Sequence, residues 1–194
     1  MTVKAAFLDR DGVINIDHAY VHRPQEFDWI DGVFEGCRQL VRAGYLLIVV
    51  TNQSGIGRGY YSEADFHALT DWMKQQFEKA GAPISGVYFC PHHPQKALGT
   101  YKQDCPCRKP APGMLLKAQQ DFDIDMQQSL MIGDKNSDML AAKAAGVPVR
   151  ILVGKDGLAE PAKSPECTQT ARNLLTAVQS FLAKHEHKTS GSGL

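Results

Sequence analysis

Four short polar segments carry residue types that could perform chemistry on a phosphate group. They are Asp9-Arg10-Asp11-Gly12, Thr51-Asn52-Gln53-Ser54-Gly55, Arg108-Lys109-Pro110 and Gly133-Asp134-Lys135. Asp138 follows the last of them by one helical turn. Mg²⁺ prefers a few carboxylate oxygens together with water and substrate phosphate, and clustered carboxylates repel one another unless a cation lies among them. Together the segments predict a site for Mg²⁺ and a phosphate.

A carboxylate in such a site can itself attack phosphorus and form an aspartyl-phosphate. The lysine and the backbone N–H groups of Thr51–Gly55 could hold charge on the phosphate oxygens. Each segment also has an ordinary interpretation, because Asp-x-Asp is common in turns and a Thr-Asn-Gln-Ser run is by itself a polar loop. The run Gly55–Gly59 has the wrong spacing for a dinucleotide-binding fingerprint and is expected to be a flexible flank. All four segments in order, each after a predicted strand, favour catalysis.

Short apolar runs alternate with helical patterns along the chain. Strands are predicted at Val3–Leu8, Tyr45–Val50, Ile84–Cys90, Ser129–Ile132 and Val149–Val153, and helices at Val33–Ala43, Ser62–Ala80, Gly113–Phe122, Asn136–Ala145 and Ala171–Ala183. This alternation predicts an α/β fold with a doubly wound, mostly parallel sheet and helices on both faces. Ligands bind such sheets at the carboxyl ends of the strands, where the polar segments lie.

The composition is that of an ordinary globular domain. Of 194 residues, 43% are apolar and 22% are charged, and 21 Lys and Arg balance 21 Asp and Glu. Even charge argues against a nucleic-acid partner, and no apolar run approaches the roughly 20 residues of a membrane span. We predict a single domain over residues 1–184 and a disordered tail over residues 185–194. A monomeric, cytoplasmic protein with a small-molecule substrate and no membrane partner is expected.

Three of the five cysteines fall close together with a histidine. Cys90, His92, Cys105 and Cys107 form the pattern C-x-H-x12-C-x-C. Three thiolates and one imidazole complete a tetrahedral Zn²⁺ site with no open position, so the ion would be structural. A redox pair of the last two cysteines would leave the other two residues unexplained, and His93 is an alternative ligand. Because Cys107 directly precedes Arg108 and Lys109, zinc in the loop 90–107 would fix the segment that carries the lysine.

The four polar segments, in this order, resemble the four motifs of the haloacid dehalogenase-like phosphatases. The resemblance extends from Phe7 to about Val153. It implies that Asp9 is the nucleophile and Asp11 the general acid and base. It also implies that Thr51 and Lys109 hold the transferring phosphoryl group, and that Mg²⁺ is bound by Asp9, the main-chain carbonyl of Asp11, and Asp134. Because Asp11 must carry a proton when the leaving group departs, we expect its neighbours to raise its pKa when substrate is bound.

The gaps between these motifs leave no room for a large cap domain, so an open site is expected. Two capless, zinc-bearing groups of the family fit, the heptose-bisphosphate phosphatases and the histidinol-phosphate phosphatases. Runs such as Asp17–His22, Cys90–Gln95 and Cys107–Pro110 resemble the first group more closely. That resemblance favours His92 as the zinc ligand. It implies hydrolysis of the C7 phosphate of D-glycero-β-D-manno-heptose 1,7-bisphosphate, a step toward the heptose of the lipopolysaccharide core.

The same resemblance implies a set of substrate contacts. They are Asp17, His18, Ala19, Tyr20, Thr51, Asn52, Gln53, Ser54, Arg108, Lys109 and Lys135. Arg108 offers a bidentate fork for a second phosphate, which histidinol phosphate lacks. A polynucleotide 3′-phosphatase would share the Asp-x-Asp chemistry but should show a basic, aromatic-bearing groove. A non-catalytic zinc module would not need the aspartates, the threonine and the lysine together.

Overall fold

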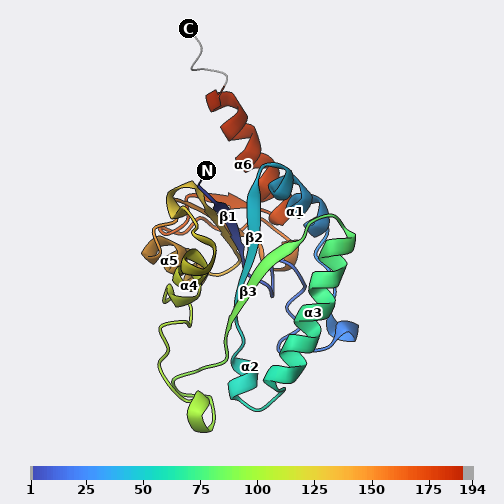
Figure 1. The fold of residues 1–194 in the computed structure, drawn as a ribbon, viewed down its shortest axis with the longest axis vertical. Helices are drawn as coiled ribbons and strands as arrows, with labels where there is room; N and C mark the ends of the chain where they lie inside the picture. The colour runs from blue at the N-terminus through green and yellow to red at the C-terminus, as the bar shows by residue number, and fades with distance from the viewer. Residues whose placement is uncertain (1, 190–194) are drawn as a thin grey trace.

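The computed structural model describes the backbone of residues 2–189 and the side chains of residues 2–184. A six-stranded sheet runs through its centre (Figure 1). The strands are β1 Lys4–Leu8, β2 Tyr45–Asn52, β3 Ile84–Cys90, β4 Leu130–Gly133, β5 Val149–Val153 and β6 Gln169–Ala171. Their order is β3-β2-β1-β4-β5-β6, and every neighbouring pair is parallel. The predicted parallel α/β architecture is confirmed.

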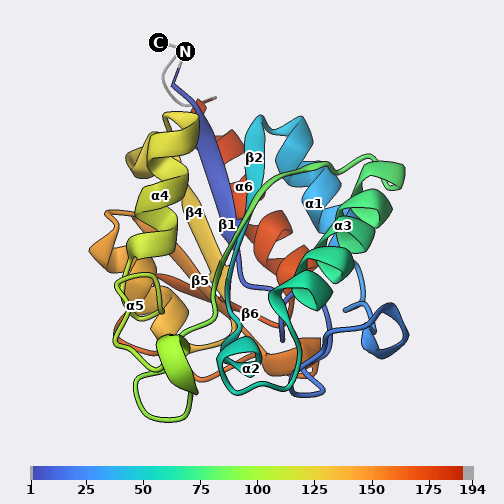
Figure 2. The same ribbon diagram turned by 60° about the horizontal axis from the view of Figure 1, so that its bottom comes forward.

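Helices cover both faces of this sheet (Figures 1 and 2). One face carries α1 (Val33–Arg42), α3 (Glu63–Lys79) and α6 (Leu174–Thr189), and the other carries α4 (Gly113–Phe122) and α5 (Asn136–Ala144). A further short helix, α2 (Ser54–Gly57), follows the carboxyl end of β2. The sheet is thus doubly wound, as the alternation of strand and helix patterns predicts.

Strand β1 shows how the apolar sequence specifies these layers. Its buried side chains alternate, since Ala6 and Leu8 belong to the core beneath α1, α3 and α6, whereas Ala5 and Phe7 belong to the core beneath α4 and α5. Residues two apart in a strand share a face, so a continuously apolar run suits a strand covered on both sides. Complete burial of a side chain such as that of Phe7 stabilises the fold by about 1.5–3 kcal/mol.

The strand order reverses between β1 and β4, which are neighbours although β2 and β3 come between them in the sequence. Asp9 directly follows β1, and its backbone N–H donates to the carbonyl of Ile132 in β4 at 3.1 Å. Crevices that bind ligands open at such reversals, at the carboxyl ends of the strands. The topology therefore brings Asp9 and Asp134, which follow β1 and β4, to the same edge of the sheet.

Three segments differ from the expectation drawn from the sequence. The edge strand β6 has only three residues and no apolar run, so it gives no strand signal. The Gly55–Gly59 flank begins inside the short helix α2, which the sequence does not predict, and its first three residues are buried. Helix α6 continues to Thr189, so residues 185–189 of the predicted disordered tail are helical, and residues 190–194 lie outside the described residues. Within residues 2–189, no helix is long and apolar enough to cross a membrane.

Candidate active site

Lys109 lies at the centre of a buried ionic network in the crevice. Its Nζ donates to Asp9 Oδ1 at 3.0 Å and to the carbonyl of Val50 at 2.8 Å, and it lies 2.6 Å from Asp138 Oδ1. Burial alone would lower the pKa of Lys109, but the carboxylates of Asp138 and Asp9 raise it well above the ordinary value. The lysine is therefore a fixed positive charge beside the predicted nucleophile.

Two of the carboxylates in a cluster of three contact this lysine. Asp9, Asp134 and Asp138 each offer an oxygen within 4.8 Å of the others. Burial, together with the charge of Asp9, raises the pKa of Asp134 to about 8, and burial together with the charge of Asp138 raises the pKa of Asp9. Such shifts are typical of buried carboxylates that lie close to one another. The donor set suits a hard divalent ion such as Mg²⁺.

The oxygens of the three carboxylates are not equally engaged. Asp138 Oδ1 faces Lys109, and its Oδ2 accepts from the backbone N–H of Lys135 at 3.0 Å. Asp134 Oδ1 and Asp138 Oδ1 are both buried without a hydrogen-bond partner among the described residues, but only Asp138 Oδ1 has a described ion pair, with the ammonium of Lys109. Buried carboxylate oxygens are normally paired. Asp134 and Asp9 are therefore the fitting ligands for a metal ion, while Asp138 positions the lysine.

Asp11 is surrounded by hydrogen-bond donors. Its Oδ1 accepts from Arg10 Nη2 at 2.9 Å and from Asn15 Nδ2 at 3.0 Å, and its Oδ2 accepts from Gln53 Nε2 at 3.0 Å. Burial would raise the pKa of Asp11, but the Arg10 guanidinium and these hydrogen bonds outweigh it and lower the pKa. The substrate-free neighbours thus favour the carboxylate, and the raised pKa expected with bound substrate stays a prediction.

The carboxyl end of β2 joins two of the predicted motifs. Asn52 Nδ2 donates to the carbonyl of Lys109, and the backbone N–H of Lys109 donates back to Asn52 Oδ1, both at 3.1 Å. Thr51 is buried, and its Oγ1 accepts from Gln53 Nε2 at 2.8 Å. The structure therefore brings Thr51, Lys109 and the aspartates together, as the order of the motifs predicts.

Two connected hollows lie over these residues. A cavity of about 240 Å³, the active-site cavity, is lined by Asp11, Asp17, Ala19, Tyr20, Asn52, Gln53, Ser54, Gly55, Tyr61 and Lys135. A smaller hollow of about 40 Å³ is lined by Asp9, Asp11, Asn52, Lys109, Lys135, Ser137 and Asp138. Most of the predicted substrate contacts thus share one space with the predicted catalytic residues.

Three predicted substrate contacts, His18, Thr51 and Arg108, do not line these two hollows. His18 lines an outer cavity of about 490 Å³, which shares Ala19 and Tyr20 with the active-site cavity, and its Nε2 lies 2.7 Å from Asp28 Oδ2. Arg108 is not among the residues that line these hollows, and its Nη1 donates to the carbonyl of His92 at 3.3 Å. Their contact with substrate stays a prediction.

Other residues of the site carry no prediction from the sequence. Asp156 follows β5, and its Oδ1 accepts from the backbone N–H of Asp17 at 2.8 Å. Its own N–H donates to the carbonyl of Gly12 at 3.3 Å. Asp156 therefore supports both the first motif and the loop Asp17–Tyr20, which we call the substrate loop. The rule that ligand sites follow strand ends would have found Asp156 after the fifth predicted strand. Tyr61, which lines the active-site cavity, has no comparable signal.

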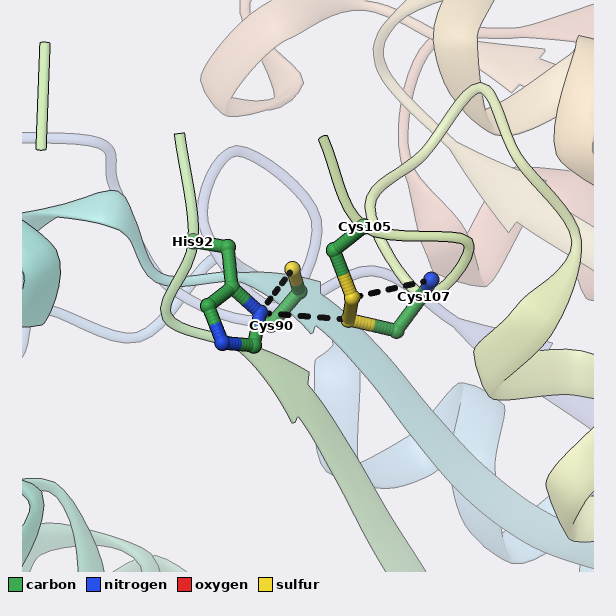
Figure 3. A group of neighbouring side chains, drawn as sticks. All are labelled: Cys90, His92, Cys105 and Cys107. Carbon is green, nitrogen blue, oxygen red and sulfur yellow. Dashed lines mark hydrogen bonds between the residues drawn. A yellow bond between two sulfur atoms is a disulfide. The ribbon is translucent and has the colours of Figure 1, made fainter. Parts of the chain in front are cut away.

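The four residues of the predicted zinc site converge in one loop region (Figure 3). One ligand atom from each of Cys90, His92, Cys105 and Cys107 lies within 4.8 Å of the others. His92 Nδ1 is 3.7 Å from the sulfurs of Cys90 and Cys107. Cys105 and Cys107 are joined by a disulfide in this structure. We refer to these four residues as the Cys/His cluster.

Comparisons with known proteins agree with the predicted fold and family. A family model described as HAD-hydrolase-like matches residues 106–177. The D-glycero-beta-D-manno-heptose-1,7-bisphosphate 7-phosphatase of Vibrio cholerae is 55% identical over 153 residues, which are 79% of this chain and 82% of that protein. The D-glycero-alpha-D-manno-heptose-1,7-bisphosphate 7-phosphatase of Burkholderia mallei is 56% identical, covering 79% of this chain and 81% of that protein.

A solved structure extends the likeness to almost the whole chain. The crystal structure of D,D-heptose 1,7-bisphosphate phosphatase from B. bronchiseptica, complexed with magnesium and phosphate, has a TM-score of 0.78 and 29% identity. The match covers 94% of this chain and 99% of that one. On the identity and coverage of these relatives, the chain belongs to the D-glycero-D-manno-heptose-1,7-bisphosphate 7-phosphatase family of the haloacid dehalogenase-like hydrolases.

Proposed function

We propose that this chain is a Mg²⁺-dependent phosphoric monoester hydrolase that removes the C7 phosphate from D-glycero-β-D-manno-heptose 1,7-bisphosphate. The observation that carries the proposal is the buried contact of Lys109 Nζ with Asp9 Oδ1 at 3.0 Å, beside the unpaired oxygen of Asp134. A nucleophilic carboxylate, a phosphate-binding cation and a metal ligand then meet at one point. The product would keep its 1-phosphate for nucleotide activation toward the lipopolysaccharide core.

The reaction proceeds in two displacements at phosphorus. An oxygen of Asp9 attacks the C7 phosphate, the bond from phosphorus to the sugar oxygen breaks, and Asp11 gives its proton to that oxygen. Asp11 then takes a proton from a water molecule, which attacks the aspartyl-phosphate and releases inorganic phosphate. Thr51 and Lys109 hold the oxygens of the transferring group in both steps, and Asp138 keeps the lysine in place.

Asp9, Asp134 and the main-chain carbonyl of Asp11 would hold Mg²⁺. When bound, the ion would neutralise charge on the phosphate and on the nucleophile. The raised pKa of Asp134 and its unpaired oxygen support this assignment. The magnesium in the related Bordetella crystal structure supports it from a second direction.

The Cys/His cluster would bind a structural Zn²⁺. Four donors within 4.8 Å of one another are compatible with a closed tetrahedral site. Zinc requires thiolates, so Cys105 and Cys107 must be reduced in the metal-bound form. Such reduction agrees with a cytoplasmic location.

The second phosphate of the substrate would be held by cations at the mouth of the cavity. Lys135 lines the active-site cavity and lies 3.9 Å from Asp17. Arg108 is next to Lys109 in the chain and would reach a phosphate beyond the reacting one. A substrate with one phosphate and a cationic amine would leave these charges unpaired, which favours the sugar bisphosphate over histidinol phosphate.

Phosphate release with Mg²⁺ tests the proposal directly. The panel contains the β and α anomers of the heptose bisphosphate, histidinol phosphate and a 3′-phosphorylated oligonucleotide, each assayed for kcat/KM. We expect the β anomer to give the highest value and the oligonucleotide to give none. A preference for the α anomer would correct the anomer, and a preference for histidinol phosphate would overturn the substrate assignment.

A further inference from the structure

The side chain of Gln53 is held at both ends by other side chains of the protein. Its Nε2 donates to Asp11 Oδ2 at 3.0 Å and to Thr51 Oγ1 at 2.8 Å, and its Oε1 accepts from the hydroxyl of Tyr61. The residue is only 3% exposed. An amide has two N–H donors and one carbonyl acceptor, so both ends of this side chain are occupied inside the protein. The contact of Gln53 with substrate stays a prediction, and the contacts described here give the side chain a further role within the protein.

Tyr61 packs closely against Gly55 of α2. It is buried, and its ring stacks on His22 with a centroid distance of 5.0 Å and an interplanar angle of 1°. The ring occupies space that Gly55 leaves open, since a Cβ on Gly55 would lie 2.3 Å from Tyr61 Cε1. Burial raises the pKa of Tyr61 far above its ordinary value, so the hydroxyl keeps the proton that it donates to Gln53.

The Asp11 carboxylate determines which way the amide of Gln53 faces, and Tyr61 holds the amide there. A carboxylate can only accept hydrogen bonds, so Asp11 requires the NH₂ end of the amide. The hydroxyl of Tyr61 holds the opposite, carbonyl end. A flip of the amide would set its carbonyl against the Asp11 carboxylate and leave that oxygen without its donor.

We propose that Gln53 and Tyr61 are positioning residues that orient Asp11 for proton transfer and fix its side chain relative to that of Thr51. The inference rests on the proposed function, because it assigns a support to the general acid of that reaction. Neither residue touches the reacting atoms. The chain of contacts runs from Tyr61 through Gln53 to Asp11, and His22 continues it to the substrate loop by a 2.8 Å contact from Nδ1 to the carbonyl of Tyr20.

A comparison of leaving groups tests the proposal. Departure of a sugar alkoxide needs a proton from Asp11, whereas p-nitrophenolate leaves without one. The parameter kcat/KM reports the first chemical step, in which the leaving group departs. We expect Tyr61→Phe to lower kcat/KM about fivefold to tenfold for the heptose bisphosphate and for glycerol 2-phosphate. For p-nitrophenyl phosphate we expect a change of less than about twofold.

The controls separate positioning from general damage. Tyr88→Phe removes a hydroxyl that bonds to Asp121 at 2.8 Å on the edge strand β3, and should leave all three substrates unchanged. Gln53→Leu should show the same pattern as Tyr61→Phe with a larger loss, and the double variant should add nothing to it. Circular dichroism and thermal unfolding check that each variant is folded.

Equal losses on alkyl and aryl phosphates would overturn the proposal, as would an unchanged kcat/KM in Tyr61→Phe. Additive losses in the double variant would also contradict it, because the two residues would then act independently. If the wild-type enzyme cleaves the simple alkyl and aryl phosphates but not the heptose bisphosphate, the substrate assignment fails. The orientation of Asp11 is still decided by the simple phosphates.

Discussion

The aspartate pocket, formed by Asp9, Asp11, Lys109, Asp134 and Asp138, and the Cys/His cluster are close neighbours held together in different ways. Cys107 and Lys109 are two residues apart, so one segment serves both regions. In the pocket, the lysine has three protein partners within 3.0 Å. In the cluster, His92 Nδ1 is no closer than 3.7 Å to the sulfurs of Cys90 and Cys107.

The difference shows which region is organised by the protein itself. Ion pairs and hydrogen bonds fix the pocket before any ligand binds, as catalysis by preorganised charges requires. In the cluster, the four donor side chains attract one another only weakly. Whether the loop keeps its shape therefore depends on the disulfide or the metal ion that joins them. We therefore expect loss of a pocket residue to act on chemistry, and loss of a cluster residue to act on position. The following predictions test this division, beginning with the largest effect.

Asp9→Asn removes the nucleophile and should lower kcat by about 10⁴-fold or more. The variant should keep the wild-type zinc content, because Asp9 makes no contact with the Cys/His cluster. Steady-state phosphate release and elemental analysis measure the two properties. Residual activity within about tenfold of the wild type would exclude Asp9 as the nucleophile, and loss of zinc would contradict the division between the regions.

Cys107→Ser should release zinc and lower kcat by roughly 10- to 100-fold, because a small displacement of a catalytic group is enough for such a loss. The matched control is Cys167→Ser, since Cys167 is buried outside the cluster and its Sγ contacts only the carbonyl of Ser164 among the hydrogen bonds described. Zinc content and kcat are measured on both variants. Full activity after proven loss of zinc would show that the cluster does not position Lys109.

Magnesium affinity should depend on pH. In the metal-free protein, burial and the charge of Asp9 raise the pKa of Asp134 from 3.8 to about 8. Between these values the folded state holds a proton that the unfolded state has released, so metal-free stability falls as pH rises. Mg²⁺ must displace that proton, so its affinity should rise by up to about tenfold per pH unit between pH 6 and 8.

Calorimetry in buffers with different ionisation enthalpies measures the protons released when Mg²⁺ binds. We expect release near pH 7 that disappears in Asp134→Asn. A magnesium affinity that is constant from pH 6 to pH 8 would show that Asp134 is already ionised in the metal-free protein.

Asp156→Ala should give the smallest effect. Loss of the hydrogen bond to the Asp17 N–H loosens the substrate loop and should raise KM by about threefold to tenfold with little change in kcat. Asp156 has a φ of 57°, a conformation that asparagine tolerates better than alanine does. Asp156→Asn keeps an acceptor oxygen and should therefore restore KM. A fall in kcat with unchanged KM would instead place Asp156 in the chemistry.

The fold could be predicted where local signals and burial agree. Ser62 and Asp65 exchange the two hydrogen bonds of a capping box, as their spacing predicts, and helix α3 begins there. The apolar run Tyr45–Val50 was enough to predict strand β2, because helices cover both faces of that strand. Strand β6 could not be found in this way, since an edge strand of three residues needs neither apolar periodicity nor length.

The candidate site could be predicted where residue type alone determines the role. Asp9 and Asp134 are charged residues at strand ends, and the segment that carries Lys109 returns beside them through its hydrogen bonds to Asn52. Tyr61 gives no such signal, because its role depends on space left by Gly55 and on the orientation of one amide. These features are set by packing between separate loops, which the sequence does not display residue by residue.

The paired hydrogen bonds between Asn52 and Lys109 have a consequence for protein engineering. They place the two residues that flank the long excursion 53–108 side by side. A segment whose two ends lie side by side forms a closed loop. Lengthening such a loop costs little additional closure entropy. This site of exit and return should therefore accept a grafted domain more readily than any junction inside the sheet, provided that the two residues of the clamp are kept.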